Sequence, residues 1–258
     1  MRKKLIQHRK EQTHMTLQPL PHNPIAVALD VETTKAAQKI CQDLSGKVGV
    51  LKIGLELFGN EGPSAITKLK ELGIPIFLDL KLHDIPNTVE KAAKAVAKLG
   101  IDFLTVHTTG GQTMLEAALH GAKTGADEAN VHPPKILGVT VLTSLGEDDF
   151  GSIGWQESSQ DQVVRLAKLA HKSGLRGLVC SGQELDVLKP QLPEMTYVVP
   201  GIRPNWAAAG DQKRVLTPAD ALAKGADYLV LGRPITQAEV PSTAAMQILE
   251  EINQGRAA

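Results

Sequence analysis

Aromatic residues are scarce in this chain of 258 residues: they make up 3% of it, although 42% of the residues are hydrophobic. A core of normal size must therefore consist of aliphatic side chains, which is typical of parallel strands covered by helices. Cysteine is also rare. Cys41 and Cys180 form no metal-binding spacing and have apolar neighbours, which predicts buried free thiols in a reducing environment.

The chain has no net charge, because 28 basic residues balance 28 acidic ones. It has no apolar run that approaches the roughly 18 residues of a membrane helix. The basic first ten residues are not followed by the apolar segment of a signal peptide. We therefore expect a cytoplasmic protein that has neither nucleic acid nor a membrane as its partner.

No linker or composition break divides the chain after residues 1–23, which we expect to form a disordered or loosely docked extension. From residue 24 onward, short apolar strands alternate eight times with helical patterns. We expect the strands at 25–30, 48–53, 74–80, 102–107, 135–142, 176–180, 196–199 and 227–231. We expect the helices at about 34–44, 65–72, 86–99, 114–122, 158–173, 183–188, 219–224 and 242–253.

This alternation predicts parallel strands with right-handed crossovers, in the α/β class. Eight units in residues 24–258 match the size of a single-domain (β/α)8 TIM barrel. The alternative is an open, doubly wound sheet, which usually has a glycine-rich phosphate-binding turn after its first strand. Here the first strand ends in DVETT, without glycine, and this favours the barrel.

The most informative stretch is PIFLDLKLHDIPNTV at residues 75–89. Asp79 and Lys81 lie in an apolar strand, where alternation places both side chains on the same face, and Asp84 follows in the next loop. Burying such charges costs several kcal/mol per ion unless they are paired. A solvated surface ion pair is the simpler interpretation, but the apolar strand around these charges favours a buried, functional group.

Further polar residues follow the other predicted strands, and a barrel carries its active site at these carboxyl ends. The candidate residues are Asp30, Lys52, Asp79, Lys81, His107, Thr143, Ser144, Arg203, Gly232 and Arg233. His107 is interpreted as a hydrogen-bonding residue and not as a catalyst. Strands seven and eight end in VVPGIRP and LGRPIT, which predicts a phosphate site formed by two arginines and the close backbone approach that glycine permits.

The sequence D-x-K-x-x-D-I-P-N-T at residues 79–88 resembles the signature of the orotidine 5′-phosphate decarboxylase family, and the resemblance extends from residue 24 to about residue 237. It implies that residues 24–258 form a barrel decarboxylase domain that acts without metal or cofactor. It further implies a homodimer in which Asp84, Ile85 and Thr88 reach into the partner's site.

The resemblance also implies a role for each candidate residue. Lys52, Asp79, Lys81 and Asp84 would form a network of alternating charge, and Asp30 and Thr88 would contact the ribose hydroxyls. Thr143 and Ser144 would contact the pyrimidine. The phosphate would be held by Arg203, Gln212, Gly232 and Arg233, with Gln212 on a closing loop.

Loss of CO2 from orotidine 5′-phosphate leaves an electron pair at C6 of the pyrimidine, and no cofactor accepts it. We expect Lys81 to stabilise this carbanion and then to protonate it, which yields UMP for pyrimidine biosynthesis. Two alternatives remain open. One is a metal-dependent sugar-phosphate lyase of a related barrel family, which would need an acid-rich Mg²⁺ site. The other is a non-catalytic barrel that binds nucleotides.

Overall fold

A closed barrel of parallel strands forms the centre of the molecule in a computed structural model that describes residues 22–207 and 216–257. The strands pair in sequence order, and β8 closes the barrel against β1. They are β1 (Ile25–Ala28), β2 (Val50–Ile53), β3 (Ile76–Leu82), β4 (Phe103–His107), β5 (Lys135–Val139), β6 (Gly177–Val179), β7 (Thr196–Val199) and β8 (Tyr228–Leu231). The predicted (β/α)8 barrel is confirmed.

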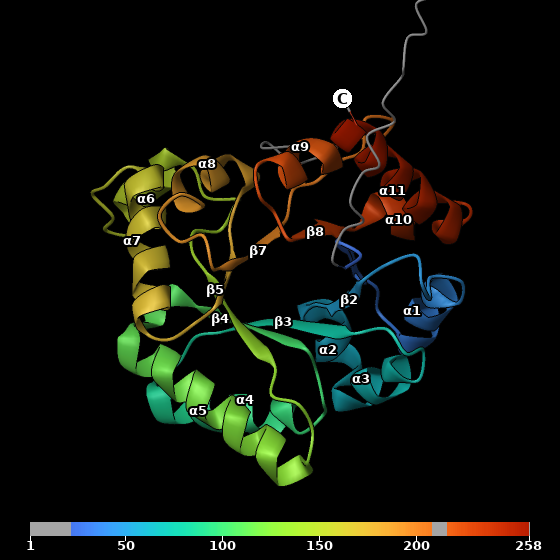
Figure 1. Ribbon diagram of the computed structural model, residues 1–258. Coiled ribbons are helices and arrows are strands. Elements are labelled where there is room, and N and C mark those ends of the chain that lie inside the picture. Colours follow the sequence, from blue (N-terminus) through green and yellow to red (C-terminus); the bar gives the residue numbers. More distant parts are fainter. Residues whose placement is uncertain (1–21, 208–215, 258) are drawn as a thin grey trace, which may run out of the picture.

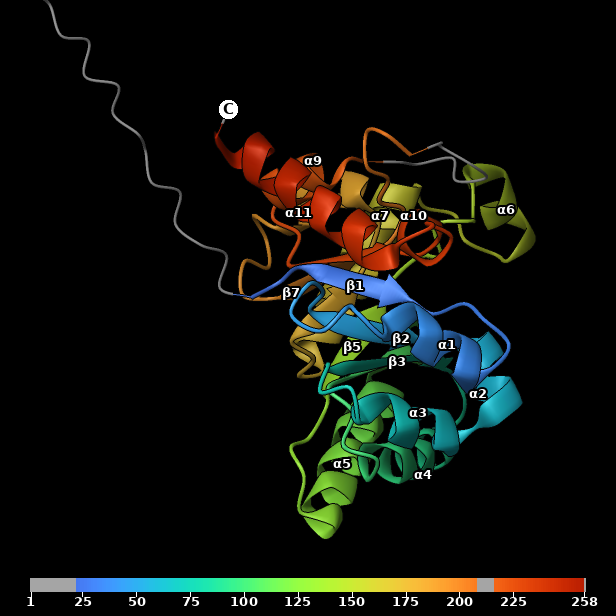
Figure 2. The same ribbon diagram turned by 90° about the vertical axis from the view of Figure 1, so that its right-hand side faces the viewer.

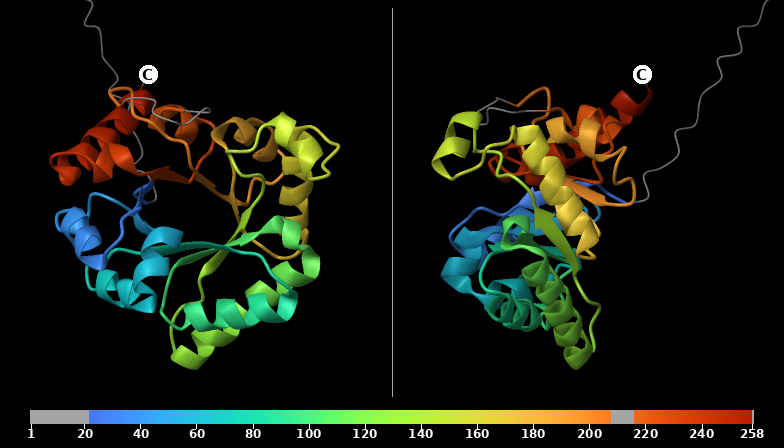
Figure 3. Two further views of the ribbon diagram at one scale, coloured as in Figure 1. Left: turned by 180° about the vertical axis from the view of Figure 1, so that it is seen from behind. Right: turned by 90° about the vertical axis from the view of Figure 1, so that its left-hand side faces the viewer.

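Helices surround the strands, as the views from the front and from behind show (Figures 1 and 3). They are α1 (Thr34–Cys41), α2 (Leu55–Glu61), α3 (Pro63–Lys70), α4 (Pro86–Ala97), α5 (Gln112–Ala129), α6 (Glu147–Ser152), α7 (Ser159–Lys172), α8 (Leu185–Leu188), α9 (Pro218–Ala223), α10 (Arg233–Thr236) and α11 (Pro241–Ala257). Helices α2, α6 and α10 were not predicted, and α5 continues seven residues beyond its predicted end.

The core has two parts, because side chains on each strand alternate between the helices and the barrel interior. The larger part is mainly aliphatic and lies between strands and helices, with Val27 and Leu51 among its fully buried members. The smaller part lies in the barrel interior and consists of Ala26, Val50, Phe77, Phe103, Leu137 and Val198. Two of the four phenylalanines lie in this smaller part, where Phe77 packs edge-on against Phe103.

Helices α4 and α5 pack closely along the outside of β3 and β4, and they lie side by side in Figures 1 and 2. Gly121 and Gly125 permit this contact. A Cβ atom at Gly121 would lie 2.1 Å from the carbonyl oxygen of Glu90, and one at Gly125 would lie 2.1 Å from that of Lys94. The strands that precede these two helices, β3 and β4, carry the candidate residues Asp79, Lys81 and His107.

The two mouths of the barrel differ. The arrow of β1 points to the side that carries α2 and α6 in Figure 2, so this side is the carboxyl-terminal mouth. At the opposite mouth, the His22 ring stacks on Tyr228 and its Nε2 lies 2.9 Å from the carbonyl oxygen of Asp227. The predicted extension, residues 1–23, lies outside the described residues apart from His22 and Asn23. Among the described helices, none is long and apolar enough to cross a membrane.

Candidate active site

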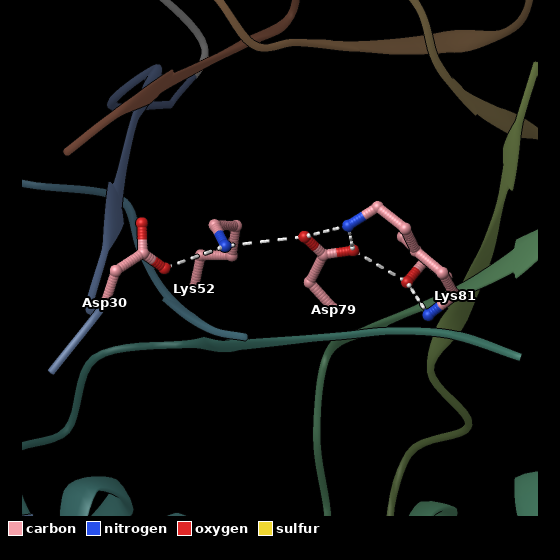
Figure 4. Close-up of polar contacts among 5 residues, drawn as sticks. Asp30, Lys52, Asp79 and Lys81 are labelled. Atoms are coloured by element: carbon pink, nitrogen blue, oxygen red, sulfur yellow. Dashed lines mark hydrogen bonds and ion pairs between the residues drawn. The ribbon is translucent and has the colours of Figure 1, made fainter. Parts of the chain in front are cut away.

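Four side chains of alternating charge form a row across the carboxyl-terminal mouth (Figure 4). Lys52 Nζ lies 3.5 Å from Asp30 Oδ1 and 3.4 Å from Asp79 Oδ2. Lys81 Nζ lies 2.8 Å from Asp79 Oδ2 and 2.9 Å from Asp79 Oδ1. The row therefore reads Asp30, Lys52, Asp79, Lys81, and it joins the segment after β1 to strands β2 and β3. The structure thus brings together the four charged residues that the first three strands contribute.

The centre of the row is buried. Lys52 is 9% exposed and Asp79 is 8% exposed, whereas the Asp30 side chain reaches into solvent. Burial on its own would raise the pKa of Asp79. The ammonium groups of Lys52 and Lys81 outweigh this effect, together with hydrogen bonds from Lys81 and Thr105, and they hold the pKa below its ordinary value. Asp79 is therefore a carboxylate at neutral pH, and it holds the Lys81 ammonium in place.

An irregularity in β3 presents Lys81 to the pocket. Leu78 pairs with Leu104, but the next matched pair is Leu82 with Val106, so β3 carries two more residues than β4 in this interval. Lys81 lies at the end of the bulge with φ of +50°, a left-handed conformation that costs about 1–3 kcal/mol for a residue other than glycine. The predicted strand end at Leu80 is therefore wrong by two residues, because the bulge carries the strand on to Leu82.

Thr105 on β4 was not among the sequence candidates, yet it connects to the row. It is completely buried. Its hydroxyl donates to Asp79 Oδ1 at 2.9 Å and accepts from the backbone N–H of Lys81 at 2.9 Å. Alternation along β4 places Thr105 on the same face as His107, which was a candidate. The spacing of two residues is the sequence signal that would have identified Thr105.

The row forms one wall of a pocket of about 570 Å³. The other walls combine apolar side chains with polar groups, which is the usual composition of a site for a small molecule. The lining residues are Ala28, Asp30, Lys52, Phe77, Asp79, Lys81, Val139, Val141, Leu142, Thr143, Val179, Cys180, Pro200, Gly201, Arg203, Val230, Gly232, Arg233 and Gln237. Its volume lies within the range of roughly 300–1,000 Å³ for ligand pockets.

A second group of basic residues reaches the same pocket from the loops after β7 and β8. Arg203 is 7% exposed and follows Gly201, whose φ of +80° turns the chain at the end of β7. Gly232 precedes α10, which begins at Arg233. The residues predicted to bind phosphate, Arg203, Gly232 and Arg233, thus line the same pocket as Lys52 and Lys81.

The remaining candidates lie apart from this pocket lining. Asp84, Ile85 and Thr88 are exposed on the loop after β3 and the start of α4, and the Asp84 carboxylate accepts the backbone N–H of Ile85 at 2.6 Å. Ser144 is exposed beyond the pocket-lining Thr143. Gln212 lies outside the described residues. Within the described chain, no ion pair joins Asp84 to Lys81, so these residues remain predictions.

Two other predicted features can be located. His107 is half-buried near His83, with 5.4 Å between the ring centroids; burial lowers the pKa of His107, and the charges of His83 and Lys81 lower it further. Cys41 and Cys180 are buried free thiols, as predicted. Burial raises the pKa of Cys41 to about 12, so this thiol stays protonated.

A closed (β/α)8 barrel with a charged pocket at the carboxyl ends of its strands is the architecture of a TIM-barrel enzyme. The family model described as "Orotidine 5′-phosphate decarboxylase / HUMPS family" matches residues 23–248. The chain belongs to this family, and the family predicted from its sequence is confirmed.

Similar proteins from several bacteria carry the same name. Orotidine 5′-phosphate decarboxylase of Paramagnetospirillum magneticum is 47% identical over 231 residues, which cover 89% of this chain and 98% of that protein. The protein of that name from Idiomarina loihiensis is 48% identical over 232 residues, with the same coverage. The crystal structure of orotidine 5′-phosphate decarboxylase from Lactobacillus acidophilus superposes with a TM-score of 0.80 at 41% identity, and the match covers 90% of this chain and 99% of that one.

Proposed function

We propose that this protein is a carboxy-lyase that converts orotidine 5′-phosphate to UMP without a cofactor, in the biosynthesis of pyrimidine nucleotides. Family membership and the names of the similar proteins support this reaction. The observation that carries the proposal is the Lys81 ammonium, which Asp79 holds at 2.8 Å in the wall of a pocket large enough for a nucleotide.

The chemistry follows from this ammonium. The bond between C6 and the carboxylate breaks, CO2 leaves, and the electron pair stays at C6. The charge of Lys81 stabilises this pair more than it stabilises the starting carboxylate, and Lys81 then donates the proton that completes UMP. Solvent returns a proton to Lys81. Lys52 helps to keep Asp79 ionised, and Asp79 in turn holds the Lys81 ammonium in position.

We assign the rest of the substrate to the remaining candidates. The phosphate binds to Arg203, Gly232 and Arg233, aided by Gln212, since arginine forks and exposed backbone N–H groups suit phosphate oxygens. Thr143 and Ser144 contact the pyrimidine, and Asp30 and Thr88 contact the ribose. Both arginines and Thr143 line the pocket that contains Lys81, which supports binding of the phosphate and the reacting ring in one site.

We further propose that the enzyme is a homodimer. Ile85 is a large apolar side chain that is 64% exposed, and it lies between the exposed polar residues Asp84 and Thr88 near the mouth of the barrel. Such a side chain is suited to burial against another protein surface. In the dimer, Asp84, Ile85 and Thr88 would complete the partner's site, with Asp84 as the second carboxylate beside Lys81.

A metal-dependent sugar-phosphate lyase is the second candidate function, but the surroundings of Asp79 favour the decarboxylase. This carboxylate lies between two ammonium groups at 2.8 Å and 3.4 Å, which would repel a divalent cation. Across residues 22–207 and 216–257, no three side chains of His, Cys, Asp or Glu form a group that could hold a metal ion.

The test is a spectrophotometric assay of orotidine 5′-phosphate loss by the purified protein, before and after treatment with EDTA. We expect equal rates, and we expect Lys81→Ala to lower kcat by more than roughly a thousandfold, because it removes both the charge and the proton donor. Lys123→Ala is the matched control, since Lys123 forms an exposed ion pair with Asp127 on α5. Normal turnover by Lys81→Ala would refute the mechanism, and activity on a ketose phosphate that EDTA abolishes would favour the lyase.

A further inference from the structure

Thr105 is a buried threonine whose hydroxyl contacts two residues of the charged row. It is 0% exposed, and it lies on β4 opposite the two-residue bulge of β3. A hydroxyl has one proton. The Thr105 oxygen accepts the backbone N–H of Lys81, with 2.9 Å between nitrogen and oxygen. The hydroxyl proton is donated to Asp79 Oδ1, with 2.9 Å between the two oxygens. One hydroxyl thus binds the backbone of Lys81 and the carboxylate that holds the Lys81 ammonium.

We propose that Thr105 is a positioning residue of the decarboxylation, and that its hydroxyl fixes the Lys81 ammonium relative to Asp79. The inference rests on the proposed function. Thr105 is not among the residues that line the pocket, so it acts through Lys81 and Asp79 and not on the substrate.

The backbone of Lys81 explains why such support is needed. Lys81 has φ of +50°, which a lysine adopts only when its surroundings hold it there. The N–H of Lys81 lies in the bulge, where the ladder to β4 is interrupted between Leu78 and Leu82. The Thr105 hydroxyl takes the place of the missing ladder acceptor. Without it, the backbone can relax and carry the ammonium away from its catalytic position.

Three variants separate the hydroxyl from the packing of this side chain. Thr105→Val keeps the shape and removes the hydroxyl, whereas Thr105→Ser keeps the hydroxyl and removes a methyl group. Thr34→Val is the matched control. Thr34 is 2% exposed, and its hydroxyl donates to the Glu61 carboxylate at 3.0 Å, outside the residues that line the pocket.

We expect Thr105→Val to lower kcat roughly ten- to a hundredfold, the effect of losing one hydrogen bond to a charged group, with KM for orotidine 5′-phosphate changed less than about twofold. We expect Thr105→Ser to restore kcat to within about threefold of the wild type. Thr34→Val is expected to lower the midpoint of urea unfolding while kcat stays at the wild-type value.

The pH profile of kcat distinguishes positioning from a general loss of structure. The charged and titratable groups around Asp79 are Lys52 on β2, Lys81 on β3 and His107 on β4. The Thr105 hydrogen bond helps to lower the pKa of Asp79. We therefore expect the fall in activity on the acidic side to begin at higher pH in Thr105→Val, and at the wild-type pH in Thr105→Ser.

Several results would overturn the inference. They are a wild-type kcat in Thr105→Val, an equal loss of kcat in Thr105→Ser, or a loss that appears in KM alone. If Thr105→Val does not fold, Thr105→Cys replaces it, because a thiol of similar size is a much weaker donor. A wild-type kcat in Thr105→Cys would then overturn the inference. Failure of the proposed function is distinct, since the wild-type protein itself would then fail to consume orotidine 5′-phosphate.

Discussion

Replacing Asp79 with Asn is expected to destabilise the protein strongly, because it leaves two ammonium groups facing each other in a buried site. With an effective dielectric constant of about 20, the contacts of Asp79 with Lys52 at 3.4 Å and with Lys81 at 2.8 Å correspond to about 5–6 kcal/mol of attraction each. Desolvation of the three charges offsets much of this energy. Removing one partner of a buried ion pair costs about 3–5 kcal/mol, and we expect the free energy of unfolding to fall by this amount.

Urea unfolding of Asp79→Asn, Lys52→Met and the double variant measures this effect. In the double variant one of the two facing cations is absent, so the double variant should be more stable than the sum of the single changes predicts, by about 0.5–3 kcal/mol. Asp127→Asn is the control, because the ion pair of Asp127 with Lys123 is exposed and should contribute less than about 1 kcal/mol. If Asp79→Asn costs no more than this control, the row of charges does not stabilise the fold.

Four further changes test the site and the fold. Arg203→Ala should weaken UMP binding at least tenfold in calorimetry but leave uridine binding unchanged, because it removes a proposed phosphate contact. Ile85→Asp should convert the proposed dimer to a monomer in analytical ultracentrifugation and lower activity in parallel. Gly125→Ala should cost about 1–3 kcal/mol in urea unfolding, whereas Gly59→Ala, with open space around it, should not destabilise. The folded pKa of Asp79 is lowered, so its contribution to stability should be complete above about pH 4, be lost as the pH falls further, and be missing in Asp79→Asn.

Each of these expectations has a result that contradicts it. An equal loss of UMP and uridine binding would remove Arg203 from the phosphate site. An active monomer of Ile85→Asp would show that the site is complete in one subunit. A stable Gly125→Ala would mean that α4 and α5 can separate without loss of stability. Parallel acid unfolding curves for the wild type and Asp79→Asn would assign the acid sensitivity to other carboxyl groups.

Most of the barrel could be predicted because its strands and helices repeat with clear periods, and the errors have local causes. Helix α2 has seven residues, contains Gly59 and lies between Gly54 and Gly62, so its intrinsic helix propensity is low. Helix α5 continues beyond its predicted end near residue 122, although it contains Gly121 and Gly125 and glycine usually weakens a helix. Its glycines serve instead to bring α4 close, a tertiary contact that the local sequence does not reveal.

The charged row was predictable because alternation along a strand places Asp79 and Lys81 on the same face. Thr105 could have been found by the same reasoning, since alternation along β4 places it on the same face as the candidate His107. The bulge that brings the Lys81 backbone to the Thr105 hydroxyl was not predictable. It depends on the relative register of two strands, and neither strand alone encodes that register.

The groups of the pocket differ in how they are anchored. Lys52, Asp79 and Lys81 stand on strands held by barrel hydrogen bonds, whereas Arg203 and Gly232 stand on connecting segments beyond β7 and β8. Insertions or exchanges in those segments can alter which molecules the pocket accepts while the strand-borne charges keep their spacing. A protein engineer who wishes to present a new carboxylate to the same lysine would therefore randomise the connections after β7 and β8 and leave β2, β3 and β4 untouched.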